Sequence, residues 1–160
     1  MAITNALKIQ KQKKQKIKVY NETVRPKPKE YVNGESFTYL GRNYRLKIIL
    51  KKDEEVKLKN GYLNTYINKK VSKNNMEETV KKSLKNWYQI KALEKLTEKT
   101  IRYASIIGVT PKSVTVKEYK SRWGSCSSDG DVSFNWRIII APHQIVDYIV
   151  VHELCHILEH

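Results

Sequence analysis

The sequence predicts a single α+β domain with an antiparallel or mixed sheet, a long backing helix and a buried C-terminal helix. Three observations lead to this prediction. Polar and apolar residues alternate within residues 36–70, helical spacing replaces the alternation over residues 75–107, and residues 145–158 are apolar on most helical faces. With 160 residues, 40% of them hydrophobic, the chain is long enough to bury one core.

Two turn sequences organise the first region into paired strands. Residues 41–43 separate two alternating runs, and Asn60-Gly61, a favoured pair for tight hairpin turns, separates two more. Because each turn joins neighbouring runs, we interpret residues 36–70 as an antiparallel meander.

The next region has the period of a helix. Asn75 and Glu78 have the spacing of a capping box, Gly108 is suited to a C-cap, and Pro111 opposes continuation. Apolar residues recur between these limits at helical spacing: Val80, Leu84, Trp87, Ile90, Leu93, Leu96, Ile101, Ala104 and Ile107. The pattern predicts a helix of about 30 residues that lies across a sheet.

Two further strands and a last helix complete the prediction. Residues 114–117 begin one strand, and residues 132–139 alternate clearly enough to predict a half-buried strand. Pro142 suits the first turn of the following helix. This helix is apolar on most faces, with Asp147 as an exception, so we expect it to be buried.

Charge divides the chain unevenly. The formal net charge is +15, and residues 1–30 carry nine basic and two acidic residues. We therefore separate residues 1–33, a basic N-terminal tail or edge strand, from a domain over residues 34–160. The basic segment is either a solvated tail or an arm that contacts an anionic partner such as nucleic acid.

Several protein classes are excluded by composition. No apolar run approaches the roughly 18 residues of a membrane span, and residues 1–18 hold no apolar core of a signal peptide. Two cysteines do not make a disulfide framework. We expect a soluble, reduced, cytoplasmic protein.

The motif with the clearest chemistry is His152-Glu153-Leu154-Cys155-His156, an HExxH sequence. Residues four apart share one helical face, so both imidazoles can reach one zinc ion. Glu153 lies on the adjoining strip, where it can act as general base toward a water held by the metal. Histidines satisfied within a core are the alternative, but burying two histidines and a glutamate on one helix is costly without a ligand.

The third zinc ligand is missing from this motif. His160 would lie about 12 Å beyond His152 on a continuous helix, too far for both imidazoles to bind one ion at about 2 Å. Only a break in the helix after His156 would allow His160 to bind the same ion. The chain given also ends inside this helix without a C-cap, so we expect a domain truncated near its metal site. Residues 158–160 fit either a native sequence that continues or the start of a Leu-Glu-polyhistidine tag.

Several segments together resemble one family, the YgjP-like metallopeptidase domain, which is related at motif level to SprT-like zinc proteases. These segments are residues 37–42, 44–46, 87–88, 120–127, 135–137 and 147–156. The resemblance implies a zincin-like fold, one zinc ion bound by His152 and His156, and Glu153 as catalytic base. It also implies a third histidine in an Asn-His-Ser segment that would fall just beyond His160.

The loop before the predicted strand over residues 132–139 offers a further candidate. Arg122 could stabilise oxyanion charge in a substrate cleft, or it could serve a structural corner at residues 122–126. The predicted strand over residues 132–139 could present an edge to an extended substrate. We expect Cys126 and Cys155 to be thiols of the core rather than ligands.

These observations favour a zinc-dependent hydrolase that cleaves peptides or proteins. The competing class is a nucleic-acid-associated binding protein that uses residues 1–30, and the two functions are compatible. A metal-free, inactive fragment of the hydrolase is the third alternative. No sequence feature identifies the substrate or the oligomeric state.

Overall fold

The computed structural model describes residues 28–159, so most of the predicted basic segment lies outside the described residues. The first sheet contains β1 (Ser36–Tyr39), β2 (Arg42–Lys51), β3 (Glu55–Lys59) and β4 (Tyr62–Asn68). Then follow α2 (Lys73–Ile107), β5 (Ser113–Lys117), β6 (Gly124–Cys126), β7 (Asp131–Asn135), the 3-10 helix η1 (Trp136–Ile140) and α3 (His143–Glu159). The α+β class is confirmed.

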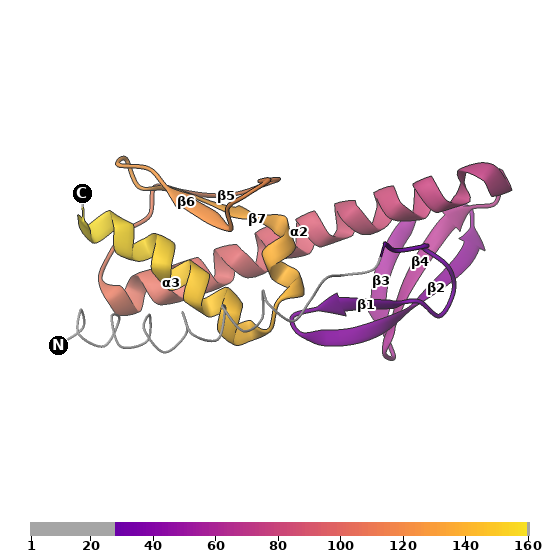
Figure 1. Cartoon of the computed structure of the whole chain (residues 1–160), viewed down its shortest axis with the longest axis horizontal. Coiled ribbons are helices and arrows are strands. Elements are labelled where there is room, and N and C mark those ends of the chain that lie inside the picture. The colour runs from indigo at the N-terminus through magenta and orange to yellow at the C-terminus, as the bar shows by residue number, and fades with distance from the viewer. Residues whose placement is uncertain (1–27, 160) are drawn as a thin grey trace.

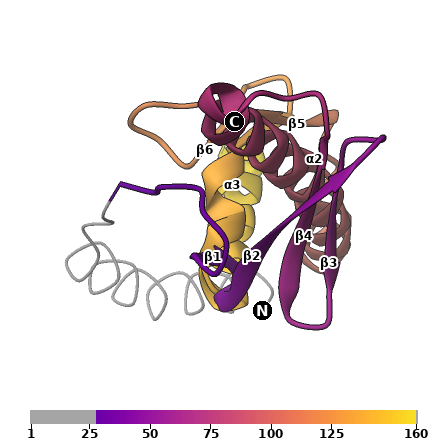
Figure 2. The same ribbon diagram turned by 90° about the vertical axis from the view of Figure 1, so that its right-hand side faces the viewer.

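Helix α2 runs the length of the described molecule and connects two halves (Figure 1). The four-stranded sheet packs on its N-terminal half, whereas α3, η1 and the three-stranded sheet pack on its C-terminal half. Figure 2 looks along the molecule from the end of the four-stranded sheet, with α3 behind it.

The first sheet is mixed, and the predicted meander is wrong. Both hairpins form, because β1 pairs with β2 and β3 with β4 in antiparallel register. The strand order, however, is β1-β2-β4-β3, with β2 and β4 parallel. Strand β4 takes the central place because it buries Leu63, Thr65 and Ile67, whereas β3 exposes Lys57 and Lys59 and suits an edge.

The long helix was predicted in type but not at its start. Its N-cap is Ser72 rather than Asn75, so the predicted capping box is wrong, and the helix has 35 residues. Its end is as predicted: Gly108 has φ of 85°, and its N–H bonds the carbonyl of Ala104. This left-handed conformation is one that glycine adopts without strain.

The buried side of α2 winds around the helix. Its buried positions recur every four residues: Val80, Leu84, Tyr88, Ala92, Leu96, Thr100 and Ala104. Since a turn takes 3.6 residues, each step of four advances the buried line by roughly 40°. Ile90, Leu93 and Ile101, which belong to the apolar spacing that predicted this helix, lie off the buried line and are exposed.

The predicted strand over residues 132–139 is too long. Strand β7 ends at Asn135, whose side chain accepts a hydrogen bond from the Arg137 N–H at 3.2 Å and so caps η1. Strand β7 is also the centre of the sheet order β5-β7-β6. It therefore presents no edge to a substrate, and the strand nearest α3 with an open edge is β6.

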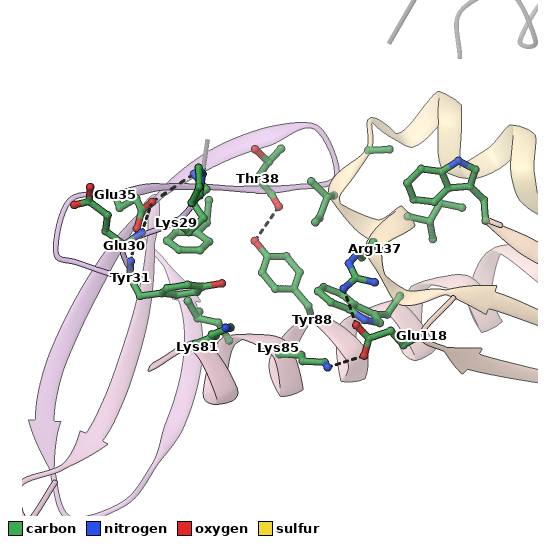
Figure 3. Close-up of a pocket in the computed structure, with 18 of the residues that line it drawn as sticks. Lys29, Glu30, Tyr31, Glu35, Thr38, Lys81, Lys85, Tyr88, Glu118 and Arg137 are labelled. Atoms are coloured by element: carbon green, nitrogen blue, oxygen red, sulfur yellow. Dashed lines mark hydrogen bonds and ion pairs between the residues drawn. The ribbon is translucent and has the colours of Figure 1, made fainter. Parts of the chain in front are cut away.

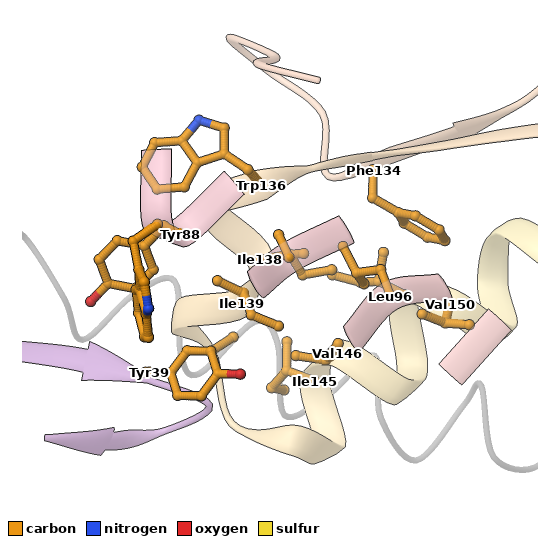
Figure 4. Close-up of a cluster of buried hydrophobic side chains, with 14 of the residues drawn as sticks. Tyr39, Tyr88, Leu96, Phe134, Trp136, Ile138, Ile139, Ile145, Val146 and Val150 are labelled. Carbon is orange, nitrogen blue, oxygen red and sulfur yellow. The ribbon is translucent and has the colours of Figure 1, made fainter. Parts of the chain in front are cut away.

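The core lies where the two halves meet (Figure 4). An aromatic series crosses the junction: the ring centroids of Tyr39 and Trp87 are 5.1 Å apart, and those of Tyr88 and Trp136 are 6.0 Å apart. The Tyr88 hydroxyl donates to the Thr38 carbonyl at 2.9 Å, and burial raises the pKa of this phenol. Such contacts fix the four-stranded sheet relative to η1 and α3.

The turn between β1 and β2 is the closest backbone contact across this junction. The N–H groups of Leu40 and Gly41 donate to the carbonyls of Ile139 and Ile140, at 2.8 and 3.2 Å. A Cβ on Gly41 would lie 2.8 Å from the backbone Cα of Pro142. Glycine is therefore required here both for its φ of 79° and for space.

We predict that Gly41→Ala destabilises the protein more than Gly61→Ala. Both glycines have φ of 79°, but nothing lies within 4 Å of a Cβ on Gly61. The Gly61 substitution should cost about 1–2 kcal/mol of unfolding free energy from backbone strain alone. At Gly41 the clash with Pro142 should add about 1–3 kcal/mol, measured by denaturant unfolding. Equal losses would show that the junction does not need the close approach.

Candidate metal centre

Helix α3 begins just after η1 and is held to α2 on the side that carries Asp147. The Pro142 carbonyl accepts hydrogen bonds from the N–H groups of Ile145 and Val146, at 2.9 and 3.2 Å. Asp147, the polar exception in the sequence, bonds the Lys99 ammonium of α2 at 2.6 Å. Both side chains are mostly buried, so this ion pair anchors α3 to α2.

Among the helices of the described part, none is both long and apolar enough to cross a bilayer.

The histidines of the motif lie side by side on α3. The ring centroids of His152 and His156 are 4.8 Å apart, and the ring planes meet at 79°. His152 also stacks on Tyr148 one turn earlier, with centroids 5.9 Å apart and planes within 16°. Both imidazoles are half-buried. The helix therefore brings together the two nitrogen donors that the spacing predicted.

Glu153 is the only carboxylate among the buried residues of the described part, with 6% of its surface exposed. Burial raises the pKa of the Glu153 carboxyl, and the nearby charges of His156 and Arg122 offset part of this rise. Burial raises the pKa of the Tyr148 hydroxyl and of the Cys126 thiol, and the negative charge of Glu153 raises both pKa values further. A carboxyl with a raised pKa is better matched to proton transfer near neutral pH than a solvated one.

Gly124 lets the edge strand β6 approach Glu153. A Cβ on Gly124 would lie 2.6 Å from Oε1 and 2.8 Å from Cδ of Glu153. The φ of Gly124 is not in the left-handed region, so packing is the reason for glycine here. The only sequence signal for this contact is a glycine inside a short strand, which does not identify Glu153 as its neighbour.

Asn135 fixes the loop that precedes β6. Its side-chain amide donates to the carbonyls of Tyr119 and Arg122, at 3.0 and 3.2 Å, and its N–H donates to the Trp123 carbonyl at 2.8 Å. Asn135 is 4% exposed, so these bonds are shielded from water. The Arg122 backbone is held in place while its exposed guanidinium lies over the Tyr119 ring, 5.5 Å from the centroid.

The other candidates lie apart from the histidine pair or supply no third ligand. His143 is exposed at the start of α3. Cys126 and Cys155 are half-buried and form no disulfide within the described residues. Within residues 28–159, no group of three or more histidine, cysteine, aspartate or glutamate side chains is placed to hold a metal ion. His160 lies outside the described residues, so the third ligand stays a prediction.

Two histidines one turn apart with an intervening buried glutamate are typical of metal-dependent hydrolases. The chain matches the family model of the YgjP-like metallopeptidase domain over residues 3–160. Because this match covers nearly the whole chain, the protein belongs to the YgjP-like metallopeptidase family. No curated protein and no solved structure matched the chain.

We predict a strong coupling between Gly124 and Glu153 in a double-mutant cycle. Gly124→Ala should lower the unfolding free energy by about 1–3 kcal/mol, because its Cβ overlaps the Glu153 carboxylate. Glu153→Ala removes all three atoms that this Cβ would meet. In that background the same glycine substitution should cost less by at least about 1 kcal/mol. An additive cycle, measured by urea unfolding, would contradict the close packing.

Proposed function

We propose that this protein is a zinc-dependent peptidase whose catalytic base is Glu153. The observation that carries the proposal is the buried Glu153 carboxylate, held against Gly124 of β6 beside the paired imidazoles of α3. Membership of a metallopeptidase family supports the same reaction class. A peptide or protein is then the substrate.

The donor set fits two of the protein ligands of a catalytic zinc site. His152 and His156 offer neutral imidazole nitrogens, which zinc accepts, and a third ligand would come from outside residues 28–159. When bound, zinc polarises the scissile carbonyl and makes water a stronger acid. Tyr148 supports the orientation of His152 by stacking on its ring.

The remaining chemistry falls to two side chains. Glu153 takes a proton from the attacking water and delivers it to the leaving amine, a task that its raised pKa favours. The Arg122 guanidinium, held by the loop that Asn135 fixes, stabilises negative charge on the carbonyl oxygen. The absence of a disulfide between Cys126 and Cys155 supports a reducing compartment, such as the cytoplasm, as the place of action.

Substitutions on α3 should separate metal binding from catalysis. In the full-length protein, Glu153→Gln should retain about one zinc while hydrolysis falls at least about 100-fold, because the general base is lost. His152→Ala should lose the zinc itself. His143→Ala, on the same helix but exposed, is the matched control and should change neither property.

Metal analysis and cleavage of an unfolded protein substrate provide the two measurements. If the full-length protein binds no zinc and hydrolyses nothing, the proposed function is wrong. Loss of zinc in Glu153→Gln would instead assign this residue to metal binding rather than to proton transfer.

Arg122→Ala should distinguish a role in catalysis from a structural corner. Because the guanidinium is exposed, its removal should leave the melting temperature unchanged. The kcat should fall about 10–100-fold with little change in KM, since the charge it offsets develops only during the reaction. A lower melting temperature with unchanged kcat would assign Arg122 to the structure of the loop.

A further inference from the structure

An apolar groove lies between the two halves of the molecule (Figure 3). It has a volume of about 1250 Å³ and is bounded by α2, η1, α3 and residues 28–38. Its apolar lining includes Leu84, Tyr88, Trp136, Ile138, Ile145 and Ile149. This volume exceeds the roughly 300–1000 Å³ of small-molecule sites, so the groove suits a segment of several residues.

The groove reaches the face of α3 that carries the histidine pair. Ile145, Ile149, His152 and His156 are spaced four, three and four residues apart, which places them on one face of α3. Trp123, which also lines the groove, lies in sequence between Arg122 and Gly124. The charge of Arg122 and the backbone of Gly124 both act on Glu153.

A second hollow adjoins the groove at Glu118 and Arg137. It has a volume of about 670 Å³ and shares Glu118, Trp123 and Arg137 with the groove. Its other walls include Lys120 and Arg122. A chain that leaves the groove past Trp123 would therefore meet basic side chains.

The charges along this path are not balanced. Glu118 is neutralised twice, by Lys85 and by Arg137, each at 2.6 Å (Figure 3). In the described part of the chain Lys120 forms no ion pair, whereas the charge of Arg122 acts on the Glu153 carboxylate. Glu30, which also lacks an ion pair there, lies at the opposite end beside Lys29. Lys120 is therefore a basic side chain without an acidic partner in the described part of the chain, beside the neutralised Glu118.

We propose that the groove binds the substrate polypeptide, with a large apolar side chain inside it and an acidic residue beside Lys120. The inference rests on the proposed function, since it places the groove next to the bond that is cleaved. Burial of an aromatic side chain against the isoleucines and aromatic rings would supply affinity. The Lys120 ammonium would favour an acidic residue next to that apolar side chain in the substrate.

Matched peptides test both parts of this preference. The full-length Glu153→Gln variant prevents cleavage, and fluorescence anisotropy with labelled peptides measures binding. A peptide that contains Phe-Asp should bind roughly tenfold or more tightly than the same peptide with Ser-Asp, because the phenyl ring is buried. Replacing Asp by Lys should also weaken binding severalfold.

Exposed residues allow variants that should still fold. Trp123, 42% exposed, can be changed to Ala, which should reduce the preference for Phe over Ser. Leu93→Ala, an exposed apolar residue on α2 outside the groove, is its control. Lys120→Glu should reverse the preference for Asp over Lys, whereas Lys117→Glu, exposed on β5 outside both hollows, should not.

The outcomes separate this inference from the proposed function. Equal binding of the Phe and Ser peptides, or a dimer in sedimentation equilibrium that the Phe peptide dissociates, would overturn the substrate groove. Zinc binding and hydrolysis without any peptide preference would overturn this inference alone. Selective binding by a full-length protein that neither binds zinc nor hydrolyses peptides would overturn the proposed function alone.

Discussion

The winding of the buried line around α2 determines how the molecule is built. If the buried positions of α2 formed a straight stripe, the helix would present the same side to all of its packing partners. The four-residue repeat from Val80 to Ala104 instead faces the four-stranded sheet at one end of α2 and α3 at the other. The two halves consequently meet at an angle, and the space between them is the apolar groove. The position of α3, and so of its histidines, follows from the same winding.

The candidate site depends on backbone positions as much as on its chemical groups. Glu153 is buried because Gly124 allows β6 to lie directly against it, and β6 is positioned by the loop that Asn135 holds. The ion pair between Lys99 and Asp147 fixes the opposite side of α3. The charged and polar groups near the carboxylate thus rest on residues that take no part in the proposed chemistry. Gly124 of β6, Asn135 of β7 and Lys99 of α2 position them.

Sequence patterns predicted the local features and missed those that depend on distant partners. Alternation and turn residues located both hairpins, and helical spacing located α2 and α3 with the histidine pair. The parallel pairing of β2 with β4 was missed, because burial in the whole sheet decides which strand is central. Apolar spacing alone did not exclude Ile90 from the core, since the partners of α2 change along its length. The approach of Gly124 to Glu153 joins segments that no local pattern connects.

The place of β3 at the edge of the four-stranded sheet also bears on the behaviour of the protein at high concentration. A strand with one unpaired side offers backbone groups to any other strand, including the same strand of a second molecule. Glu55, Lys57 and Lys59 alternate along one face of β3, with Lys57 paired to Glu55 at 2.8 Å, and charged side chains on an edge strand oppose the addition of a further strand. The strand order β1-β2-β4-β3 therefore places charged side chains at this open edge, where they disfavour aggregation through β3.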